Sequence, residues 1–589
     1  MKDIRSFVDV WKKYMYVLTP AQKRWGIVVF IVCFLSALAE LLGISIIIPV
    51  VQAMININVL RENIYISKLC KYFNVISDYQ LIKILILCVI LVYLIKNLYL
   101  FLATWIKIKY TYKVRREISV NMIYAYIRRG YIFLKTKNIA EVVRGCGDSI
   151  TNFTDVIFCF FTIISDLLMM LCVFLFLLFV DLKMTMGLLL IALICLGLVA
   201  GLFRKASQVA GKEYFEKNMI CNKWIHQIFY GIKEVLVMNK AKYFVKKYEE
   251  TFMEQQKAGI TKSIATNTPP YIIETFCVIG IMMVIFFKIG NTSDISSYIT
   301  IIASFALSVF RILPCVGRVS VNINFIVYFL NNINEVYDNF MESKAWQKNI
   351  EDTNPKISVG NMKFSNKVNI KEIKFRYPNT SENILDSISI TINKGESIAI
   401  IGQSGAGKST LADILLGLIK PDEGNITIDD MDIFDNKELW AQNIAFVPQN
   451  VYLLDDTIKN NVCFGNDYQD ENYIWKVLEE AQIKEYIENL PEKLDTIIGE
   501  RGVRMSGGQI QRLAIARALY NKPEILVLDE ATSALDNETE KNVMCAIDKL
   551  QGKMTIIIIA HRLSTIKKCD RIYEICNGKV NERKYEELT

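Results

Sequence analysis

Residues 397–409 read SIAIIGQSGAGKS, a short apolar segment followed by a glycine-rich loop that ends in a lysine and a serine. The loop has the spacing G-x-x-x-x-G-K-[ST], which is typical of a phosphate-binding loop. The segment Ser397–Ile401 predicts a buried strand, and Thr410–Ile419 predicts the helix that such a loop opens. Glycines let a backbone wrap closely around phosphates, and a helix N-terminus carries partial positive charge. The stretch therefore predicts an α/β nucleotide-binding domain.

The residue types at the end of this loop fit the chemistry of a nucleotide. Lys408 supplies a positive charge for the β- and γ-phosphates, and the Ser409 hydroxyl is placed to hold Mg²⁺. We expect the following residues to surround the phosphates: Gly402, Gln403, Ser404, Gly405, Ala406, Gly407, Lys408, Ser409 and Thr410. The alternative is an ordinary glycine-rich turn, which would not require the Lys-Ser pair. We therefore predict ATP and Mg²⁺ as cofactors.

Length and composition indicate a membrane protein of several domains. The chain has 589 residues, too many for one core, and 52% of them are hydrophobic. A net charge of +8 is compatible with nucleic-acid binding, but many basic residues flank apolar runs, as is typical of the cytoplasmic side of a membrane. We predict no nucleic-acid partner. The 14 cysteines are scattered singly and predict apolar packing residues rather than disulfides or zinc ligands.

Apolar runs of nearly bilayer length predict six membrane-spanning helices within a transmembrane domain at 1–340. They cover approximately residues 25–54, 81–107, 156–180, 184–203, 271–289 and 297–316. Basic residues follow the second, fourth and sixth runs, which predicts a multi-pass protein of the cytoplasmic membrane with both termini in the cytoplasm. The polar connections 108–155 and 204–268 have helical spacing and predict membrane helices continued into the cytosol. A linker at 341–359 leads to the nucleotide-binding domain at 360–589.

Two adjacent acids follow a second apolar strand in the nucleotide-binding domain. Asp529 comes directly after Ile525–Leu528, where its carboxylate can reach Mg²⁺ directly or through water. Glu530 is then placed to polarise an attacking water molecule as general base. Two neighbouring carboxylates repel each other in a site of low dielectric constant, so the pair favours a catalytic role.

Together these segments resemble an ATP-binding cassette (ABC) half-transporter of the exporter type, with the membrane domain first. The signature of that family is matched by Met505-Ser506-Gly507-Gly508-Gln509, although leucine is usual where Met505 stands. The resemblance implies an all-α six-helix transmembrane domain with long cytoplasmic helix extensions, followed by an α/β P-loop domain of the ABC type. It also implies ATP hydrolysis coupled to transport, by alternating access of the membrane domain.

The same resemblance assigns roles to further residues. His561, after the apolar strand Thr555–Ala560, corresponds to the switch histidine that contacts the γ-phosphate and is catalytic. Gln449 corresponds to a ligand of Mg²⁺ and water, and Tyr377 to the aromatic ring on which adenine stacks. Asp536 belongs to the loop through which the two sites communicate.

The signature residues Ser506, Gly507, Gly508 and Gln509 precede an amphipathic helix, whose amides can bind a phosphate. In the family this loop reaches the γ-phosphate held by the other subunit. One chain has one phosphate loop and one signature, so a second copy of the chain is the expected partner, in a two-fold homodimer. The resemblance also places coupling helices near Tyr131–Asn138 and Ile225–Ile232.

Charges inside apolar runs are energetically expensive and point to the cargo. Lys96, Arg311 and Arg318 are predicted to line a central cavity and to bind substrate; the alternative is that they extend to a membrane interface. Three carboxylates are also embedded and able to pair with these cations: Glu40, Asp166 and Glu274.

Some local features resemble one subgroup, the flippases of lipid-linked oligosaccharides in bacterial protein glycosylation. They include the segments Asn291–Ser296 and Arg311–Pro314. Pro270 departs from the subgroup, in which an arginine is expected nearby. The resemblance implies an amphipathic, lipid-linked substrate whose diphosphate would bind the cavity cations. The alternatives are a peptide or drug exporter, or a non-transporting ABC ATPase that regulates another protein. The identity of the substrate and its direction of movement stay open, as does a different chain in place of the second copy.

Overall fold

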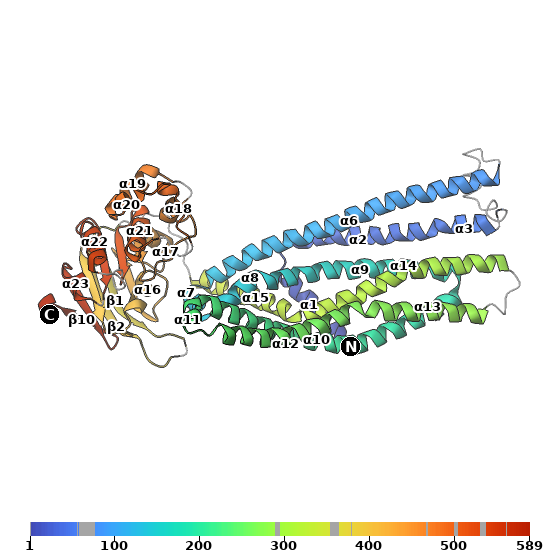
Figure 1. Cartoon of the computed structure of the whole chain (residues 1–589), viewed down its shortest axis with the longest axis horizontal. Coiled ribbons are helices and arrows are strands. Elements are labelled where there is room, and N and C mark those ends of the chain that lie inside the picture. Colours follow the sequence, from blue (N-terminus) through green and yellow to red (C-terminus); the bar gives the residue numbers. More distant parts are fainter. Residues whose placement is uncertain are drawn as a thin grey trace. The chain divides into compact units, whose positions relative to one another are not determined.

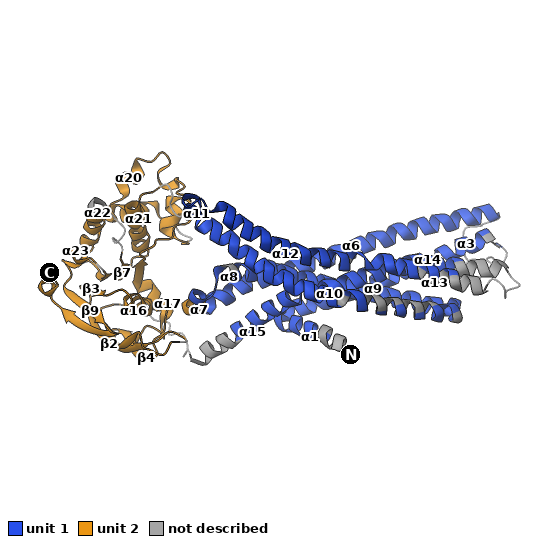
Figure 2. Ribbon diagram, turned by 60° about the horizontal axis from the view of Figure 1, so that its bottom comes forward, with its two compact units in different colours: residues 1–129, 134–347 blue, residues 130–133, 348–589 orange. Residues whose placement is uncertain are grey.

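The structure is a computed structural model that describes residues 2–588 with the exception of 56, 58–76, 289–294, 354–363, 379, 467–468, 500–504, 531–536 and 561. It comprises two compact units (Figure 2). The first contains residues 1–129 and 134–347, and the second contains residues 130–133 and 348–589.

The first unit is built from helices, several of which are long and lie side by side (Figure 1). They are α1 (Lys2–Val17), α2 (Pro20–Ser45), α3 (Ile47–Ile55), α6 (Asp78–Arg128), α8 (Ile139–Cys146), α9 (Asp148–Val180), α10 (Leu182–Tyr230), α11 (Ile232–Val237), α12 (Ala241–Asn267), α13 (Pro269–Lys288), α14 (Ile295–Tyr328) and α15 (Leu330–Thr353). Helix α9 packs against α2, α6 and α14, and α10 packs against α12.

Sequence signals at the helix starts explain where the first two long helices begin. The side chain of Thr19 caps α2 by accepting a hydrogen bond from the Gln22 amide, and Pro20 occupies the first turn. Ser77 and Gln80 form the same reciprocal capping box at the start of α6. Each cap satisfies backbone donors that have no partner within the helix, and a proline at the first turn sacrifices no hydrogen bond.

Within the described residues, four helical stretches are long and apolar enough to cross a membrane: Pro20–Met54, Asp78–Arg128, Glu141–Val180 and Ala303–Tyr328. They overlap the first, second, third and sixth predicted spans. Helix α14 continues past residue 316, where the predicted span ended, to Tyr328. The other two predicted spans fall within α10 and α13, which are helices, and their place in the membrane stays a prediction.

The two long polar connections are helical, as predicted. Helix α6 continues without a break to Arg128, and α10 continues to Tyr230. The short helix α7 (Tyr131–Thr136) lies in the first predicted coupling segment. In the second segment Gly231 ends α10 and the short helix α11 follows, so this helix begins only at the last residue of the predicted segment. Residues 341–353 of the predicted linker are also helical, because α15 continues through them.

The second unit contains two sheets. Its strands are β1 (Lys367–Phe375), β2 (Leu385–Asn393), β3 (Ser397–Gly402), β4 (Glu423–Ile428), β5 (Met431–Asp432), β6 (Ile444–Val447), β7 (Ile525–Asp529), β8 (Thr555–Ile559), β9 (Arg571–Cys576) and β10 (Lys579–Arg583). One sheet is antiparallel, with the order β2-β1-β4-β5, and the other has the order β10-β9-β3-β8-β7-β6. In the second sheet β3, β6, β7, β8 and β9 are parallel, so their carboxyl ends share one edge. Ligands of open α/β sheets bind at such an edge.

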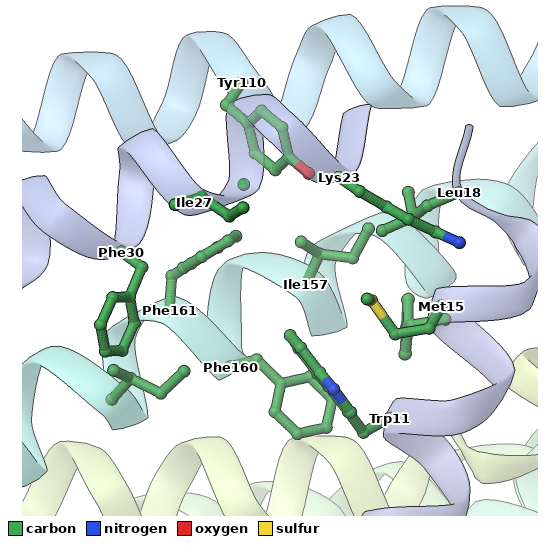
Figure 3. Close-up of a pocket in the computed structure, with 13 residues that line it drawn as sticks. Trp11, Met15, Leu18, Lys23, Ile27, Phe30, Tyr110, Ile157, Phe160 and Phe161 are labelled. Carbon is green, nitrogen blue, oxygen red and sulfur yellow. The ribbon is translucent and has the colours of Figure 1, made fainter. Parts of the chain in front are cut away.

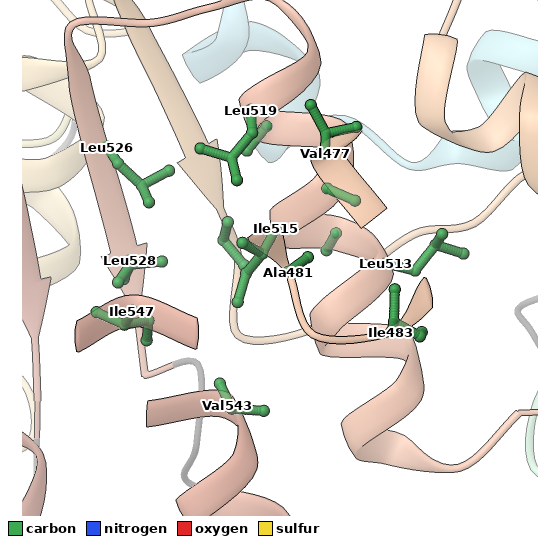
Figure 4. Packing of buried hydrophobic residues seen from close by; sticks show 14 of the residues in the cluster. Val477, Ala481, Ile483, Leu513, Ile515, Leu519, Leu526, Leu528, Val543 and Ile547 are labelled. Carbon is green, nitrogen blue, oxygen red and sulfur yellow. The ribbon is translucent and has the colours of Figure 1, made fainter. Parts of the chain in front are cut away.

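Helices pack against this sheet and share apolar cores with its strands. They are α16 (Lys408–Leu415), α17 (Lys437–Asn443), α18 (Ile458–Cys463), α19 (Glu471–Glu480), α20 (Lys484–Glu488), α21 (Gly507–Tyr520), α22 (Asn537–Asp548) and α23 (Leu563–Ile566). Figure 4 shows α21 in the middle of one such core, with Ile515 near Leu528 of β7 and Leu513 near Ile483. Removal of this apolar surface from water stabilises the folded unit by about 25 cal/mol per Å². The packing therefore fixes the start of α21 relative to the sheet.

One short segment joins the second unit although it lies early in the sequence. Residues 130–133 group with this unit, and Ile132 of α7 packs against the core formed by Phe434, Trp440 and the surrounding strands. The partly buried position of Ile132 fits the predicted coupling role of this segment, which stays a prediction.

Candidate nucleotide site and charged cavity

The phosphate loop connects β3 to α16 and depends on glycine at two positions. Gly402 and Gly407 have φ angles of 150° and 104°, which side chains rarely adopt. A Cβ atom on Gly402 would lie 2.4 Å from the carbonyl oxygen of Ile575, and one on Gly407 would lie 2.8 Å from Leu385. Gln403, Ser404 and Gly405 are exposed, so the middle of the loop presents its backbone to solvent.

Lys408 is the first residue of α16 and lies beneath this loop. Its ammonium group donates hydrogen bonds to the carbonyl oxygens of Gly402 and Gln403, at 2.8 and 2.9 Å. Burial lowers the pKa of Lys408, while the nearby Glu530 and Asp529 carboxylates act in the opposite direction. Ser409 is exposed at the same helix N-terminus, where an anion is favoured. The predicted loop residues are thus brought together around one open surface.

Tyr377 lies beside the start of α16. Its hydroxyl is 3.4 Å from the Thr410 hydroxyl, and its ring packs edge-on against Phe375 with a centroid distance of 5.1 Å. The aromatic ring predicted to stack on adenine is therefore next to the phosphate loop, although 25 residues separate them in sequence.

The two acids lie at the carboxyl end of β7, as predicted. Asp529 is the last residue of the strand, and Glu530 has a φ angle of 47°, which is unusual for a residue other than glycine. Its backbone amide donates a hydrogen bond to Ile559 of β8 at 2.9 Å, which holds the turn in place. Such strained conformations cluster at functional sites.

Gln449 connects this acid to the signature helix. Its side-chain amide donates a 2.6 Å hydrogen bond to the Glu530 carboxylate. Its backbone carbonyl accepts a 3.1 Å hydrogen bond from the Gln511 side chain of α21. Gln511 was not predicted; its position two residues after the signature and on the buried side of an amphipathic helix is the only sequence signal for it.

The signature residues form the N-terminus of α21. Ser506 caps the helix: its hydroxyl accepts a 3.4 Å hydrogen bond from the Gln509 amide, and its own amide donates a 2.8 Å hydrogen bond to the Gln509 side chain. Ser506 and Gly507 are exposed, whereas Gly508 is buried. The pattern S-x-x-Q is itself a capping-box signal. His561 and Asp536 lie outside the described residues.

The first unit contains the candidate membrane spans and is called the membrane unit from here on. It contains a cavity of about 460 Å³ that is lined by both apolar and charged side chains. Apolar side chains such as Phe158, Met169 and Phe310 form part of its wall. The charged residues that line it are Glu40, Lys107, Asp166, Arg311 and Arg318. Arg311 and Arg318 therefore lie where the sequence placed them. Lys96 was also predicted to line the cavity but does not, because its side chain is buried and only 3% exposed.

Glu40 holds two of the predicted cations. Its carboxylate is 3.1 Å from the Lys96 ammonium and 3.5 Å from the Arg311 guanidinium. The ring of Tyr93 lies 4.6 Å from the Lys96 ammonium, and its hydroxyl accepts a 3.3 Å hydrogen bond from Arg311. Gly43 makes room for Lys96, because a Cβ atom there would be 3.0 Å from the lysine side chain. Tyr93 was missed because nothing in its own sequence segment distinguishes it.

A second pair lies on the same cavity wall. Arg318 binds the Asp166 carboxylate through two nitrogen atoms, at 2.6 and 3.1 Å, and Asp166 is buried whereas about half of Arg318 is exposed. The predicted pairing of embedded carboxylates with these cations is therefore confirmed for Glu40 and Asp166. Glu274 is exposed on α13.

Comparisons with known proteins agree with this architecture. The family profile described as ABC transporter transmembrane region matches residues 27–313, and the profile described as ABC transporter matches residues 385–533. The solved structure of a bacterial Atm1-family ABC exporter with ATP bound has a TM-score of 0.78, with 19% identity, over 96% of this chain and 97% of its own. The fold is thus that of an ABC exporter.

Curated relatives match over a shorter length. The ATP-dependent lipid A-core flippase of Pasteurella multocida (strain Pm70) is 44% identical over 218 residues, which is 37% of this chain and 38% of the relative. An uncharacterized ABC transporter ATP-binding protein of Bacillus subtilis (strain 168) is 41% identical over 249 residues, 42% of this chain and 43% of the relative. The chain thus spans about two fifths of the length of these relatives.

A helical membrane unit and an α/β unit with a phosphate loop, joined in this order in one chain, define an exporter-type half-transporter that binds ATP. The chain belongs to the ABC transporters, and the family inferred from its motifs is confirmed.

Proposed function

We propose that two copies of this chain form an ATP-driven exporter or flippase that moves an amphipathic, lipid-linked substrate, most specifically a lipid-linked oligosaccharide, across the cytoplasmic membrane by alternating access. The observation that carries this proposal is the cavity in the membrane unit, where Arg311 and Arg318 lie beside an apolar wall. Two guanidinium groups at one apolar wall, each beside a carboxylate that a stronger anion could replace, favour a cargo with an anionic group on an otherwise apolar body.

The loop residues fit a nucleotide. A Cβ atom at Gly402 or Gly407 would collide with Ile575 or Leu385, so glycine keeps the loop close to the sheet, and the Lys408 ammonium donates to two of the loop carbonyls. In the proposal the backbone of residues 402–409 and Lys408 hold the phosphates of ATP, and Tyr377 stacks on the adenine. Ser409, Asp529 and Gln449 would hold Mg²⁺ together with water. Bound Mg²⁺ would neutralise charge on the phosphates.

Glu530 is the proposed general base, and its geometry supports the role. The strained turn after β7 directs its carboxylate to Gln449, which fixes one oxygen atom at 2.6 Å. A carboxylate held in this way at the end of β7 could accept a proton from water, as general-base catalysis requires. His561 is proposed to orient the same water and the γ-phosphate.

The proposed homodimer places each signature against the phosphate loop of the other copy. Ser506 and Gly507 are exposed at the N-terminus of α21, where the Gly507 amide could bind a phosphate; the Ser506 amide already donates to the Gln509 side chain. Because Gln511 of the same helix binds Gln449, and Gln449 binds Glu530, contact at the signature would be transmitted to the catalytic acid. Asp536 is proposed to communicate between the two sites.

On the cargo side, Glu40 and Asp166 keep the arginines neutralised in the absence of substrate. A diphosphate would compete with these carboxylates for the guanidinium groups, which bind phosphate oxygens in pairs. Lys96 is proposed to hold Glu40 in place rather than to touch the cargo. The lipid A-core flippases among the relatives support a lipid substrate in general but not this particular glycan.

The proposed orientation, with both termini in the cytoplasm, is supported by exposed aromatic residues near basic ones. The Lys113 ammonium is 5.8 Å from the ring of Trp25, and the Lys109 ammonium is 4.7 Å from the ring of Trp105. Tryptophan is enriched at membrane interfaces, and lysine at cytoplasmic ones.

Reconstitution in liposomes tests this function. The protein is supplied with ATP and Mg²⁺, and the translocation of a polyprenyl diphosphate glycan is compared with that of a panel of peptides and drugs. We expect ATP-dependent movement of the glycan lipid. Movement of a peptide or drug alone would replace the proposed substrate, and hydrolysis without movement of any cargo would favour a regulatory ATPase.

A further inference from the structure

A second cavity, separate from the charged one, lies between α1, α2, α6 and α9 (Figure 3). Its volume is about 280 Å³, near the lower limit of about 300 Å³ for small-molecule sites. Aromatic rings form much of its wall: Trp11, Tyr14, Phe30, Tyr110, Phe160 and Phe161. A cavity of this size and lining fits a segment of hydrocarbon chain rather than a whole amphipathic molecule.

The hydroxyl groups in the wall are already paired. Tyr110 donates a 3.1 Å hydrogen bond to the carbonyl oxygen of Gln22, and Tyr14 donates one to the carbonyl oxygen of Phe153. Lys23 contributes the only charge among the described lining residues, and within the described chain it forms no ion pair. Figure 3 shows its amino group directed away from Phe30 and Phe161. The site therefore combines an apolar interior with one cation at its edge.

The surroundings of this cavity are those of a membrane surface. Ile27 and Phe30 line it and are 61% and 45% exposed, so it opens on the outer side of α2. Lys23 lies in the first turn of the candidate span Pro20–Met54, at the level where lipid headgroups are expected. The exposed Trp25 two residues later supports this level, because tryptophan is enriched there.

We infer that this cavity binds one acyl chain of an anionic membrane phospholipid, whose phosphate is held by Lys23. Burial of the chain against the aromatic wall is favourable by about 25 cal/mol per Å² of apolar surface. The headgroup adds an attraction to the lysine, which is desolvated only in part and extends toward the interface. This site requires a membrane but is independent of the proposed transport reaction.

The occupied site would also fix the position of α1. On its other side this helix contacts α15: the Lys13 ammonium donates a 2.7 Å hydrogen bond to Asn334, and Tyr16 packs edge-on against Tyr337 at 5.3 Å. A lipid between α1, α2 and α9 would complete the packing on the side where the protein leaves a cavity.

Photo-crosslinking tests the acyl-chain site. The full-length protein is placed in phosphatidylcholine nanodiscs that contain phosphatidylglycerol with a diazirine on one acyl chain, and labelled peptides are mapped by mass spectrometry. We expect labels within residues 11–30 and 157–164. Ile27→Trp, which fills the cavity from its exposed edge, should reduce this labelling severalfold. Val28→Trp is the matched control, because Val28 is exposed next to it but does not line the cavity.

Competition tests the headgroup. Unlabelled phosphatidylglycerol should displace the probe better than phosphatidylcholine, and Lys23→Gln should reduce that preference by about fivefold, the effect of one basic residue at a membrane surface. The control is Arg24→Gln, which removes an exposed neighbouring charge outside the lining. Equal labelling of Ile27→Trp and Val28→Trp would overturn the acyl-chain site. An unchanged preference in Lys23→Gln would overturn the headgroup contact, and a crosslink to a second copy at this surface would assign the cavity to an interface instead.

Discussion

The two units of the molecule hold their functional charges in different ways. In the nucleotide-binding unit the polar groups lie at strand ends and helix N-termini, where backbone geometry positions them: Lys408 follows β3, and Glu530 follows β7. In the membrane unit the charges lie within apolar helices and are held by one another, as in the Asp166–Arg318 pair. Local backbone geometry is therefore decisive in one unit, and pairing between distant helices in the other.

The largest expected effect is at the catalytic acid. Glu530→Gln removes the proposed general base while it preserves the hydrogen-bonding shape, so ATP hydrolysis should fall by about 10²–10⁴-fold. ATP should still bind and hold two copies in a closed dimer. Hydrolysis and dimerisation are measured on the purified protein with ATP and Mg²⁺.

The matched control for this variant is Glu524→Gln, because Glu524 directly precedes β7 and is half-exposed in an ion pair with Lys394. It should hydrolyse ATP at nearly the original rate. Normal hydrolysis by Glu530→Gln would refute the general-base assignment, and with it the claim that strand-end geometry identifies catalytic groups in this unit.

The second effect tests pairing in the membrane unit. Glu40→Ala leaves Lys96, whose side chain is only 3% exposed, without its carboxylate partner. Loss of one partner of a buried ion pair costs about 3–5 kcal/mol, reduced here because 21% of Glu40 is exposed. We expect a lower thermal stability in detergent, largely restored when Lys96→Met is added.

Glu274→Ala is the control, because it removes a carboxylate that is exposed on α13. It should have little effect on thermal stability. If Glu40→Ala and Glu274→Ala are equally stable, the Lys96–Glu40 pair does not hold the helices as the structure indicates.

The contrast between the units also explains how much the sequence could predict. Glycines with strained φ angles and a Lys-Ser pair are contiguous, so residues 402–409 were identifiable as one loop without any partner. The embedded charges were identifiable one by one, and even their pairing was proposed. The burial of Lys96 could not be predicted, because it depends on how α2 packs against α6. That packing brings Gly43 and Tyr93 next to the lysine side chain.

Helix lengths show the same limit. Apolar runs located the spans of α2, α6, α9 and α14, but polar residues past Val316 and into the linker concealed that helices α14 and α15 continue. A hydrophobic pattern marks where a helix meets lipid, whereas packing against neighbouring helices decides where it ends.

The third effect concerns cargo. Arg311→Ala removes a half-exposed guanidinium from the cavity and should lower the ratio of cargo-stimulated to unstimulated ATP hydrolysis by about tenfold, as expected for one charged hydrogen-bonded contact. The stimulation is measured with a polyprenyl diphosphate glycan. Arg116→Ala is the control, because Arg116 is exposed on α6 outside the cavity. An unchanged ratio in Arg311→Ala would show that cavity pairing has no part in cargo recognition.

The smallest expected effect separates the two roles of Ser506. Ser506→Ala removes the helix cap, which is worth about 1 kcal/mol, so amide hydrogen exchange in the first turn of α21 should accelerate by about fivefold. Ser506→Asn keeps a capping side chain and should exchange at nearly the original rate. Both variants should hydrolyse ATP slowly, because in the proposal the hydroxyl and its loop also contact the phosphate held by the second copy. Full hydrolysis by Ser506→Asn would show that Ser506 serves only as the helix cap. The signature would then act through the backbone geometry of α21 alone.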